Sequence, residues 1–290
     1  MWRESLSVCE SLEGRRLLSG ATLGPHGVLK VTGDLHVPNT IDVEVNAQGQ
    51  VVVNVLSPAA KHGATSLSKT FAGTIARIDI TGGKAADTIT VGTSSVLNVK
   101  TRIFGIAGDD SIAVGNQNAR IFGGRGTDVI TAGNGNDLIA GGKGADSITA
   151  GSGDDTLFGG PGPDTIVAGA GNDTIHGGKG NDSITVNDTF ANSSLIFGDA
   201  GNDTINVANG NDTIWGGAGN DTINAGDGND TFGCVLGSNT VTTGTSGHNT
   251  YDVGKVNTNS FPDFNSALDT LVTKVKHDAD AGPEPAAPIG

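Results

Sequence analysis

The chain has 290 residues, of which 47 are Gly, 9 are Pro and only 4 % are aromatic, and its formal net charge is −14. So much Gly with so few rings cannot build the close-packed core of an ordinary globular domain, and Gly does not recur at every third position as it does in collagen. The acidic balance argues against binding nucleic acid or an anionic membrane through charge, because both need basic patches.

Residues 1–20 form the first predicted segment, an N-terminal element of an exported protein. It has no apolar run long enough for a secretory signal, and no stretch of the chain approaches the length of a transmembrane helix. The run LEGRRLLS, from Leu12 to Ser19, is similar to a short LExRxLLS element that opens many secreted or surface proteins of one bacterial group. This resemblance implies export from a bacterial cell.

Residues 21–104 are predicted to form a degenerate, β-rich cap. Alternating apolar residues over 41–45 and 51–55 flank the loop 46–50, a spacing that predicts a β-hairpin. Residues 82–90 read GGKAADTIT, a nearly complete copy of the nine-residue unit that follows. This arm is expected to make wide coils with few ligands, which cap the stack of coils as solenoids require.

Residues 105–233 repeat a nine-residue unit, and twelve residues, 186–197, interrupt this array. Typical copies read AGAGNDTIH and GGAGNDTIN. Gly at positions one, two and four allows a tight turn, and positions seven to nine make a short strand whose middle side chain points inward. The eighth position is always apolar and comprises Ile112, Ile121, Ile130, Ile139, Ile148, Leu157, Ile166, Ile175, Ile184, Ile205, Ile214, Ile223 and Phe232.

Two units make one flattened coil of eighteen residues with two strands. Successive coils then stack as parallel strands, with a narrow ladder of Ile side chains between two sheets. Such a core needs few aromatic residues, and the frequent Ile, Val and Thr residues favour strands over disorder. The sequence therefore predicts an all-β chain, with a right-handed parallel β-roll or β-helix solenoid between degenerate β-rich caps.

The sixth position of the unit is Asp in every copy except one, which has Ala119. The segment 105–233 contains 17 Asp, no Glu and four basic residues, so it holds a net 13 of the 14 negative charges. Asp residues in successive coils would lie one strand spacing apart, about 4.8 Å. Two charges at that distance repel by roughly 1 kcal/mol in water and several-fold more at a protein surface. The sixth-position residues are Asp110, Asp128, Asp137, Asp146, Asp155, Asp164, Asp173, Asp182, Asp203, Asp212, Asp221 and Asp230.

A hard divalent cation between adjacent turns would remove this repulsion. Ca²⁺ accepts about six to eight oxygens in flexible geometry, whereas Mg²⁺ demands octahedral geometry and gives up water reluctantly. Zn²⁺ and copper fit worse, because the turns carry no Cys or His ligands. The alternative is a metal-free solenoid in which the Asp residues serve only as turn formers.

The unit resembles the G-G-x-G-x-D-x-U-x nonapeptide of the RTX, or hemolysin-type, calcium-binding proteins, a β-helix repeat that binds Ca²⁺. The resemblance implies that the twelve sixth-position Asp residues bind several Ca²⁺ ions, whereas Ala119, Asn239 and Asn249 do not. It also implies ligand carbonyls around the turn glycines, which are Gly123, Gly126, Gly141, Gly144, Gly159, Gly162, Gly177, Gly180, Gly216 and Gly219.

Residues 234–277 are predicted to form a degenerate C-terminal cap, in which Asn239 and Asn249 replace the Asp of the repeat. Apolar residues at helical spacing over 262–277 predict one short amphipathic helix. The Pro- and Ala-rich residues 278–290 are expected to be disordered. RTX proteins typically leave the cell by a type I system that reads a C-terminal signal, and the Pro-rich end departs from the usual form of that signal. The two cysteines, Cys9 and Cys234, lie in different settings, and a disulfide between them is not favoured.

No catalytic motif stands out in the chain. It has neither the H-E-x-x-H helix of metalloproteases nor the G-x-S-x-G elbow of lipases. Carboxylate pairs such as Asp109/Asp110 and Asp154/Asp155 suggest acid–base work on polysaccharides, but the repeat explains each pair as one ligand Asp after a variable residue. The alternatives are the calcium-binding module of an RTX-type protease, lipase, polysaccharide-modifying enzyme or toxin, and a β-solenoid enzyme whose site has no short motif.

The sequence thus predicts a secreted or cell-surface calcium-binding repeat protein without catalysis, in a structural, adhesive or matrix role. Ca²⁺ is expected to drive its folding, because binding energy becomes folding energy when the unfolded chain has no site. Weak sites, of about 10⁻⁴–10⁻³ M, fill outside the cell. The expected partners are Ca²⁺ ions and an extracellular polysaccharide or a cell surface. Asp188, inside the interruption, is expected to matter little for Ca²⁺.

Overall fold

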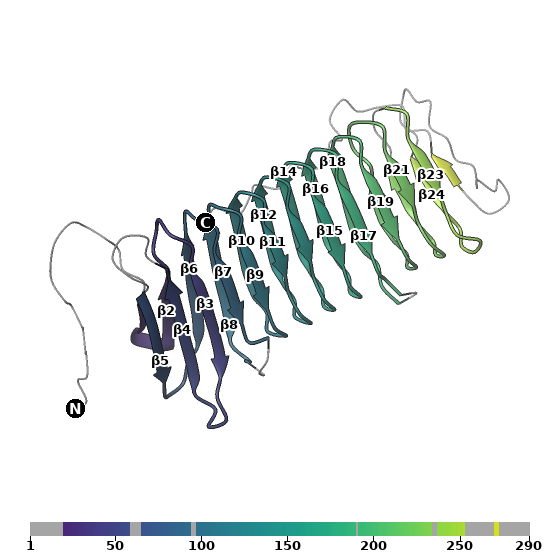
Figure 1. The fold of residues 1–290 in the computed structure, drawn as a ribbon. Coiled ribbons are helices and arrows are strands. Elements are labelled where there is room, and N and C mark those ends of the chain that lie inside the picture. Colours follow the sequence, from purple (N-terminus) through teal and green to yellow (C-terminus); the bar gives the residue numbers. More distant parts are fainter. Residues whose placement is uncertain are drawn as a thin grey trace.

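The fold was analysed in a computed structural model, which describes residues 20–58, 65–93, 97–189, 191–233, 237–252 and 270–272. This part of the chain contains 25 strands and one short 3-10 helix, η1 (Pro25–Gly27). The strands form a 13-stranded and a 12-stranded sheet, stacked as a β-solenoid of about eight turns (Figure 1). The predicted all-β fold of parallel stacked coils is confirmed.

From β5 to β24, successive strands of the chain belong to alternate sheets. The 13-stranded sheet has the order β1 (Gly20–Leu23), β2 (Val28–Thr32), β6 (Arg77–Gly83), β8 (Lys100–Ile106), β10 (Ala119–Arg125), β12 (Leu138–Lys143), β14 (Thr156–Pro161), β16 (Thr174–Lys179), β18 (Leu195–Ala200), β20 (Thr213–Trp215), β22 (Thr231–Gly233), β24 (Thr250–Asp252) and β25 (Thr270–Val272). The 12-stranded sheet has the order β23 (Thr240–Thr242), β21 (Thr222–Asn224), β19 (Thr204–Val207), β17 (Ser183–Val186), β15 (Thr165–Ala168), β13 (Ser147–Thr149), β11 (Val129–Thr131), β9 (Ser111–Val114), β7 (Thr88–Val91), β3 (Thr40–Val45), β4 (Val51–Ser57) and β5 (Thr65–Phe71).

The core of the array is the predicted ladder of eighth-position side chains. Ile148 pairs with Ile130 in the coil before it and with Ile166 in the coil after it, eighteen residues away in each direction. All thirteen eighth-position side chains are at most 1 % exposed. At least one buried apolar side chain from each short strand therefore contributes to a continuous core, and the residues on either side of it point outward because side chains alternate along a strand.

The N-terminal cap contains the predicted hairpin. Strands β3 and β4 are antiparallel, with Ile41 opposite Val55 and Val45 opposite Val51. Strand β5 adds a third antiparallel strand, and only β2 and β3 continue in parallel into the coil of β6 and β7. The N-terminal arm therefore combines an antiparallel end with parallel coils that continue into the array.

The interruption at 186–197 leaves both sheets continuous. Val186 ends β17 and Leu195 begins β18, and the eighth-position ladder proceeds from Ile175 to the buried Ile196. The coil that contains the interruption has 21 residues in place of eighteen, as the pairing of Ile184 with Ile205 also requires. The twelve residues thus supply one strand and three extra turn residues.

At the C-terminal end, the structure differs from the predicted helix over 262–277 at three positions. Thr270–Val272 form β25, which pairs in parallel with β24, because Thr and Val suit an extended strand at the edge of a sheet. The rest of the predicted helix lies outside the described residues, as do the N-terminal element, the tail 278–290, Cys9 and Cys234. Among the described helices, none has the length and apolar character to cross a membrane.

Candidate metal centres

Each nonapeptide turn delivers its sixth-position Asp to the end of a strand with the carboxylate turned inward. All twelve of these Asp residues are between 0 and 3 % exposed. Gly142 and Gly144 show why the turn needs glycine, since their φ angles of +116° and +138° are strained for other residues. The turn thereby buries charged groups, which is costly unless they are paired or bind a cation.

The Asp residues form two columns along the solenoid, one in each of the two turns of a coil. The first column, in chain order, is Asp87, Asp110, Asp128, Asp146, Asp164, Asp182, Asp203, Asp221 and Asn239. The second column is Ala119, Asp137, Asp155, Asp173, Ser194, Asp212, Asp230 and Asn249. The structure thus brings the predicted ligand residues together coil by coil.

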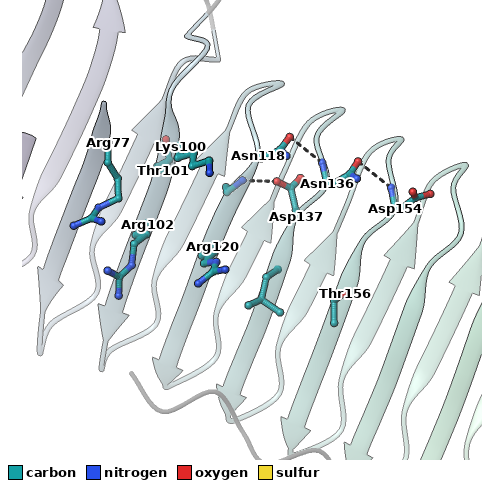
Figure 2. Close-up of a pocket in the computed structure, with 12 residues that line it drawn as sticks. Arg77, Lys100, Thr101, Arg102, Asn118, Arg120, Asn136, Asp137, Asp154 and Thr156 are labelled. Carbon is teal, nitrogen blue, oxygen red and sulfur yellow. Dashed lines mark hydrogen bonds between the residues drawn. The ribbon is translucent and has the colours of Figure 1, made fainter. Parts of the chain in front are cut away.

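One carboxylate oxygen of each Asp is used within its column. The backbone N–H of Asp128 donates to Oδ1 of Asp146 at 2.8 Å, and the N–H of Asp146 donates to Oδ1 of Asp164 at 2.8 Å. At the start of the second column, the N–H of Ala119 donates to Oδ1 of Asp137 at 2.7 Å, in the region that Figure 2 draws. Each coil therefore satisfies a backbone donor of the coil before it.

The other oxygen, Oδ2, is buried without a hydrogen-bond partner in eleven of the twelve sixth-position Asp residues. In the first column this oxygen faces the first Gly of its own turn, and at most of these turns a carbonyl from the next coil converges with it. A Cβ placed on Gly159 would lie 2.5 Å from Oδ2 of Asp164 and 2.5 Å from the carbonyl oxygen of Gly177. Only oxygen acceptors therefore meet at this point.

The predicted glycine carbonyls fall into two groups. Those of Gly123, Gly141, Gly177 and Gly216 lie beside first-position glycines of the preceding coil, next to the Asp Oδ2 atoms. Carbonyls of fourth-position glycines face the fourth-position glycine of the following coil, where a Cβ would overlap them, and these are Gly126, Gly144, Gly162, Gly180 and Gly219. At Gly141, in the coil before Gly159, the atoms nearest to an added Cβ belong to Asp146.

This donor set fits a hard cation. In the described residues there is no compact group of three or more His, Cys, Asp or Glu side chains, so a bound ion would take many of its ligands from backbone carbonyls. Ca²⁺ accepts such mixed carboxylate and carbonyl oxygens, whereas Zn²⁺ prefers nitrogen and sulfur. The buried Oδ2 atoms without donors and the glycine cradles therefore agree with calcium chemistry.

The electrostatics of the columns favour protonation when no cation is bound. Burial raises the pKa of Asp110, Asp155 and Asp164 to about 7, and neighbouring carboxylates in the column add to the rise. The single N–H donor to each group lowers the pKa but does not offset burial. Burial likewise raises the pKa of Asp128 and Asp137 to about 6.

The carboxylate pairs that suggested acid–base chemistry separate into different ladders. Asp110 and Asp155 belong to the buried columns. Asp109 accepts the N–H of Thr127 at 2.8 Å, and Asp154 donates its N–H to Asn136 in the exposed ladder of Figure 2. Each pair is thus one inward and one outward group, as the repeat interpretation expects.

Two acidic residues of the columns were missing from the predicted ligands. Asp87 heads the first column at 1 % exposure, and its N–H donates to Oδ1 of Asp110 at 2.8 Å. The signal for it was present, since it is the sixth residue of GGKAADTIT. Asp188 is also buried, at 5 % exposure, and lies against Ser194 in the second column. Its sequence position gave no signal, because three extra residues displace it from the repeat.

Comparison with known families agrees with this geometry. The family model for the RTX calcium-binding nonapeptide repeat (4 copies) matches residues 104–139, 114–148, 131–166, 158–188 and 197–232. The array consists of RTX calcium-binding nonapeptide repeats. No curated protein matches the chain. The RTX matches leave out residues 189–196, so the family pattern does not cover the turn that carries Ser194. The chain is accordingly a calcium-binding repeat protein.

Proposed function

We propose that the chain is a secreted or cell-surface protein whose RTX array folds when Ca²⁺ binds along both Asp columns, and that it acts by binding and not by catalysis. One observation carries the proposal. In both columns, eleven of the twelve buried sixth-position carboxylates have an Oδ2 atom that accepts no hydrogen bond. Unpaired buried charge of this kind opposes folding. A cation that the unfolded chain cannot hold would reverse the balance.

The residues of the array have distinct parts in this proposal. Oδ1 of each Asp holds the backbone of the preceding coil, and Oδ2 is left to face a cation together with carbonyls of the turns. Ca²⁺ supplies the positive charge that neutralises the column. Millimolar sites of this type fill outside the cell and stay empty in the cytosol, so the array would fold only after export, where Ca²⁺ is available.

A Ca²⁺ titration followed by far-UV circular dichroism tests this proposal. The metal-free full chain should show little array β signal, and added Ca²⁺ should restore it cooperatively, whereas the same concentration of Mg²⁺ should not. Calorimetry then gives the number of ions bound. A full β signal in excess chelator, unchanged by Ca²⁺, would overturn the proposal and favour the metal-free solenoid.

A second candidate concerns the partner, which we propose is an acidic polysaccharide bound on a basic groove. The groove has a volume of about 570 Å³ and crosses the outer face of the 13-stranded sheet at β6, β8 and β10. Figure 2 draws Arg77, Lys100, Arg102 and Arg120 along it, with Asp137 and Asp154 at its far end. Four basic side chains side by side are a concentrated patch in a chain of net charge −14.

The contacts of these side chains support an anionic ligand. Asp79 pairs with Arg77, at 2.7 Å and 2.8 Å, but among the described residues neither Arg102 nor Arg120 forms an ion pair. Nε of Arg102 is buried without a partner, although its guanidinium lies 5.5 Å from the ring of Phe104. Guanidinium groups bind carboxylates with two parallel hydrogen bonds, and adjacent strands repeat them at about 4.8 Å.

Aromatic rings follow the basic residues along the same face. Phe104 stacks on Phe122 with 5.1 Å between ring centroids, and further along His176 stacks between Phe158 and Phe197. Amphipathic faces of sugar rings pack against such side chains, so a linear acidic polysaccharide could follow the solenoid axis from the basic groove to the aromatic row.

Binding of a soluble polyuronate at fixed, saturating Ca²⁺ tests this second candidate. The double variant Arg102→Ala/Arg120→Ala should weaken binding at least about tenfold, whereas Arg125→Ala, outside the groove, should leave it within twofold. Equal binding by all three proteins would overturn it. New reducing ends in the same mixtures would instead reveal polysaccharide cleavage and contradict the non-catalytic role.

A further inference from the structure

The second Asp column has a gap at the coil of the interruption. Between Asp173 and Asp212, the sixth-position residue is Ser194. The hydroxyl of Ser194 accepts the N–H of Asp173 at 3.1 Å, and the N–H of Ser194 donates to Oδ1 of Asp212 at 2.7 Å. Ser194 therefore keeps the hydrogen bonds of the column, but it lacks the second carboxylate oxygen that the Asp positions of the column provide.

Asp188 brings a carboxylate into this gap from the turn of the interruption. Its Oδ2 accepts the hydroxyl of Ser194 at 2.6 Å. The residue is 5 % exposed, and its Oδ1 is buried without a hydrogen-bond partner in the described structure. The Oδ2 atom of Asp188 is thus bonded to the column, whereas its Oδ1 atom is buried and unpaired, like the Oδ2 atoms of the regular Asp positions.

Its neighbours place Asp188 between two coils. It lies close enough to Asp173 in the preceding coil and to Asp212 in the following coil for its charge to raise the pKa of both. The backbone of Gly171, in the turn that carries Asp173, also donates to it. Asp188 therefore lies between these two coils, at the level of the column where the carboxylate is missing.

We propose that Asp188 is a Ca²⁺ ligand that replaces the carboxylate missing at Ser194 and completes a site between the coils of Asp173 and Asp212. This inference rests on the proposed calcium-dependent folding. A merely structural Asp188 would need only its hydrogen bonds with Ser194, the backbone of Gly171 and the side chain of Asp212, and the amide oxygen of Asn could accept the first two equally well. Burying a second, unpaired carboxylate oxygen is costly, and a cation offsets this cost.

The test is the number of Ca²⁺ ions bound by the full chain, measured by calorimetry with Ca²⁺ alone, for three variants. Asp188→Asn should lose at least one ion, as should Asp146→Asn in the regular first column. Asp154→Asn removes a charge from the exposed ladder and should bind as many ions as the unchanged chain. Circular dichroism at saturating Ca²⁺ checks that each variant folds.

The outcomes separate this inference from the proposed function. If Asp146→Asn loses ions while Asp188→Asn keeps the full number, the role of Asp188 is overturned and calcium-dependent folding stands. If the unchanged chain binds no Ca²⁺, the proposed function itself fails.

A rescue variant keeps the inference testable if Asp188→Asn does not fold. Adding Ser194→Asp to it restores a carboxylate at the regular sixth position, and the double variant should recover both the fold and the lost ion. Recovery of the fold without the ion would overturn the role of Asp188.

Discussion

At the scale of single residues, a column Asp accepts a hydrogen bond at only one of its two carboxylate oxygens. Asp164 accepts one N–H bond at Oδ1, from Asp146 at 2.8 Å, and none at Oδ2. Buried carboxylates that accept two or three N–H bonds have lowered pKa values. With one donor, burial prevails and the pKa of Asp164 rises to about 7. The residue thus favours either a proton or a cation at the same oxygen.

The raised pKa values predict opposite effects of pH on the metal-free fold and on Ca²⁺ binding. Protonation of Asp110 and Asp155 is favoured by folding, because their pKa is about 7 in the fold against an ordinary value of 3.8. The free energy of unfolding of the metal-free protein should therefore rise as the pH falls from about 7 towards 4. Ca²⁺ affinity should fall over the same range, since protons compete.

Circular dichroism of the metal-stripped chain between pH 7 and 4 measures the first effect, and calorimetry in buffers of different ionisation enthalpy detects the protons that Ca²⁺ releases. A metal-free chain that loses β signal on acidification down to pH 4 would contradict the first prediction.

A methyl group in the cradle should disturb the site directly. In Gly159→Ala, the new Cβ would lie 2.5 Å from both Asp164 Oδ2 and the Gly177 carbonyl, so one or both oxygens must move. Such overpacking costs about 1–3 kcal/mol, which corresponds to a loss of Ca²⁺ affinity of about fivefold or more at that site. Gly20→Ala is the control, because its Cβ would contact no atom within 4 Å. Equal Ca²⁺ titrations for both variants would contradict this account of the cradle.

At the scale of elements, no strand of the array could persist alone. Strands such as β13 and β21 have three residues, and each buries one Ile. Each is held by parallel pairing to the coils on either side, as β13 is to β11 and β15. Strand and turn therefore stabilise each other: the buried Ile sets the register that aligns the Asp column, and the neutralised column allows the strands to pair.

This coupling predicts that a ladder residue that is not itself a ligand still affects calcium binding. Ile166→Ala should lower the free energy of unfolding at saturating Ca²⁺ by about 2–5 kcal/mol, because a fully buried side chain is truncated. It should also raise the Ca²⁺ concentration needed for folding. Val129→Ala, on a strand but 49 % exposed, should change the stability by about 0.5 kcal/mol or less. Urea unfolding at several Ca²⁺ concentrations measures both, and similar losses for the two variants would argue against the ladder as the core.

At the scale of the whole molecule, the N-terminal cap and the repeat array of the described solenoid are stabilised by different interactions. The cap around β1 to β5 has antiparallel strands and buried aliphatic residues such as Leu29, Val43 and Val53, with Asp87 as its first column carboxylate. The array from β9 to β23 has at least one inward apolar side chain per strand and a buried Asp at most of its turns. In a stack of repeats each coil interacts mainly with its neighbours, so the stable end can template the next coil.

Removal of calcium should therefore act unevenly along the chain. After chelation, limited proteolysis should cut first within residues 105–233 and should leave the strands of residues 20–91 protected for longer. Mass spectrometry of the fragments over time identifies the order of cleavage. The Ca²⁺-loaded protein is the control and should resist cleavage in both regions, and equal cleavage rates after chelation would contradict a calcium-independent cap.

The sequence predicts well those features that depend on the nine-residue period. Coil length, the Ile ladder and the two sets of Asp follow from nine-residue spacing, and the hairpin follows from alternation. Strand β5 and the position of Asp188 could not be predicted, because each depends on contacts between segments without a shared period. The strand at Thr270–Val272 was missed because helical spacing of its apolar residues outweighed β-branching when the sheet edge beside it was unknown.

Because the strands alternate between the two sheets, it matters whether the number of nonapeptide copies is odd or even. Because successive nonapeptides enter opposite sheets, the insertion or loss of a single copy would exchange the two faces for everything downstream, whereas a pair of copies changes only the length. The outward row of Phe158, His176, Phe197 and Trp215 stays on one face because the irregular segment 186–197 counts as one copy. Related proteins can therefore differ in the length of the solenoid by steps of eighteen residues and keep the same residues on each outer face. A change by an odd number of nonapeptides would instead place the downstream part of the aromatic row on the opposite face.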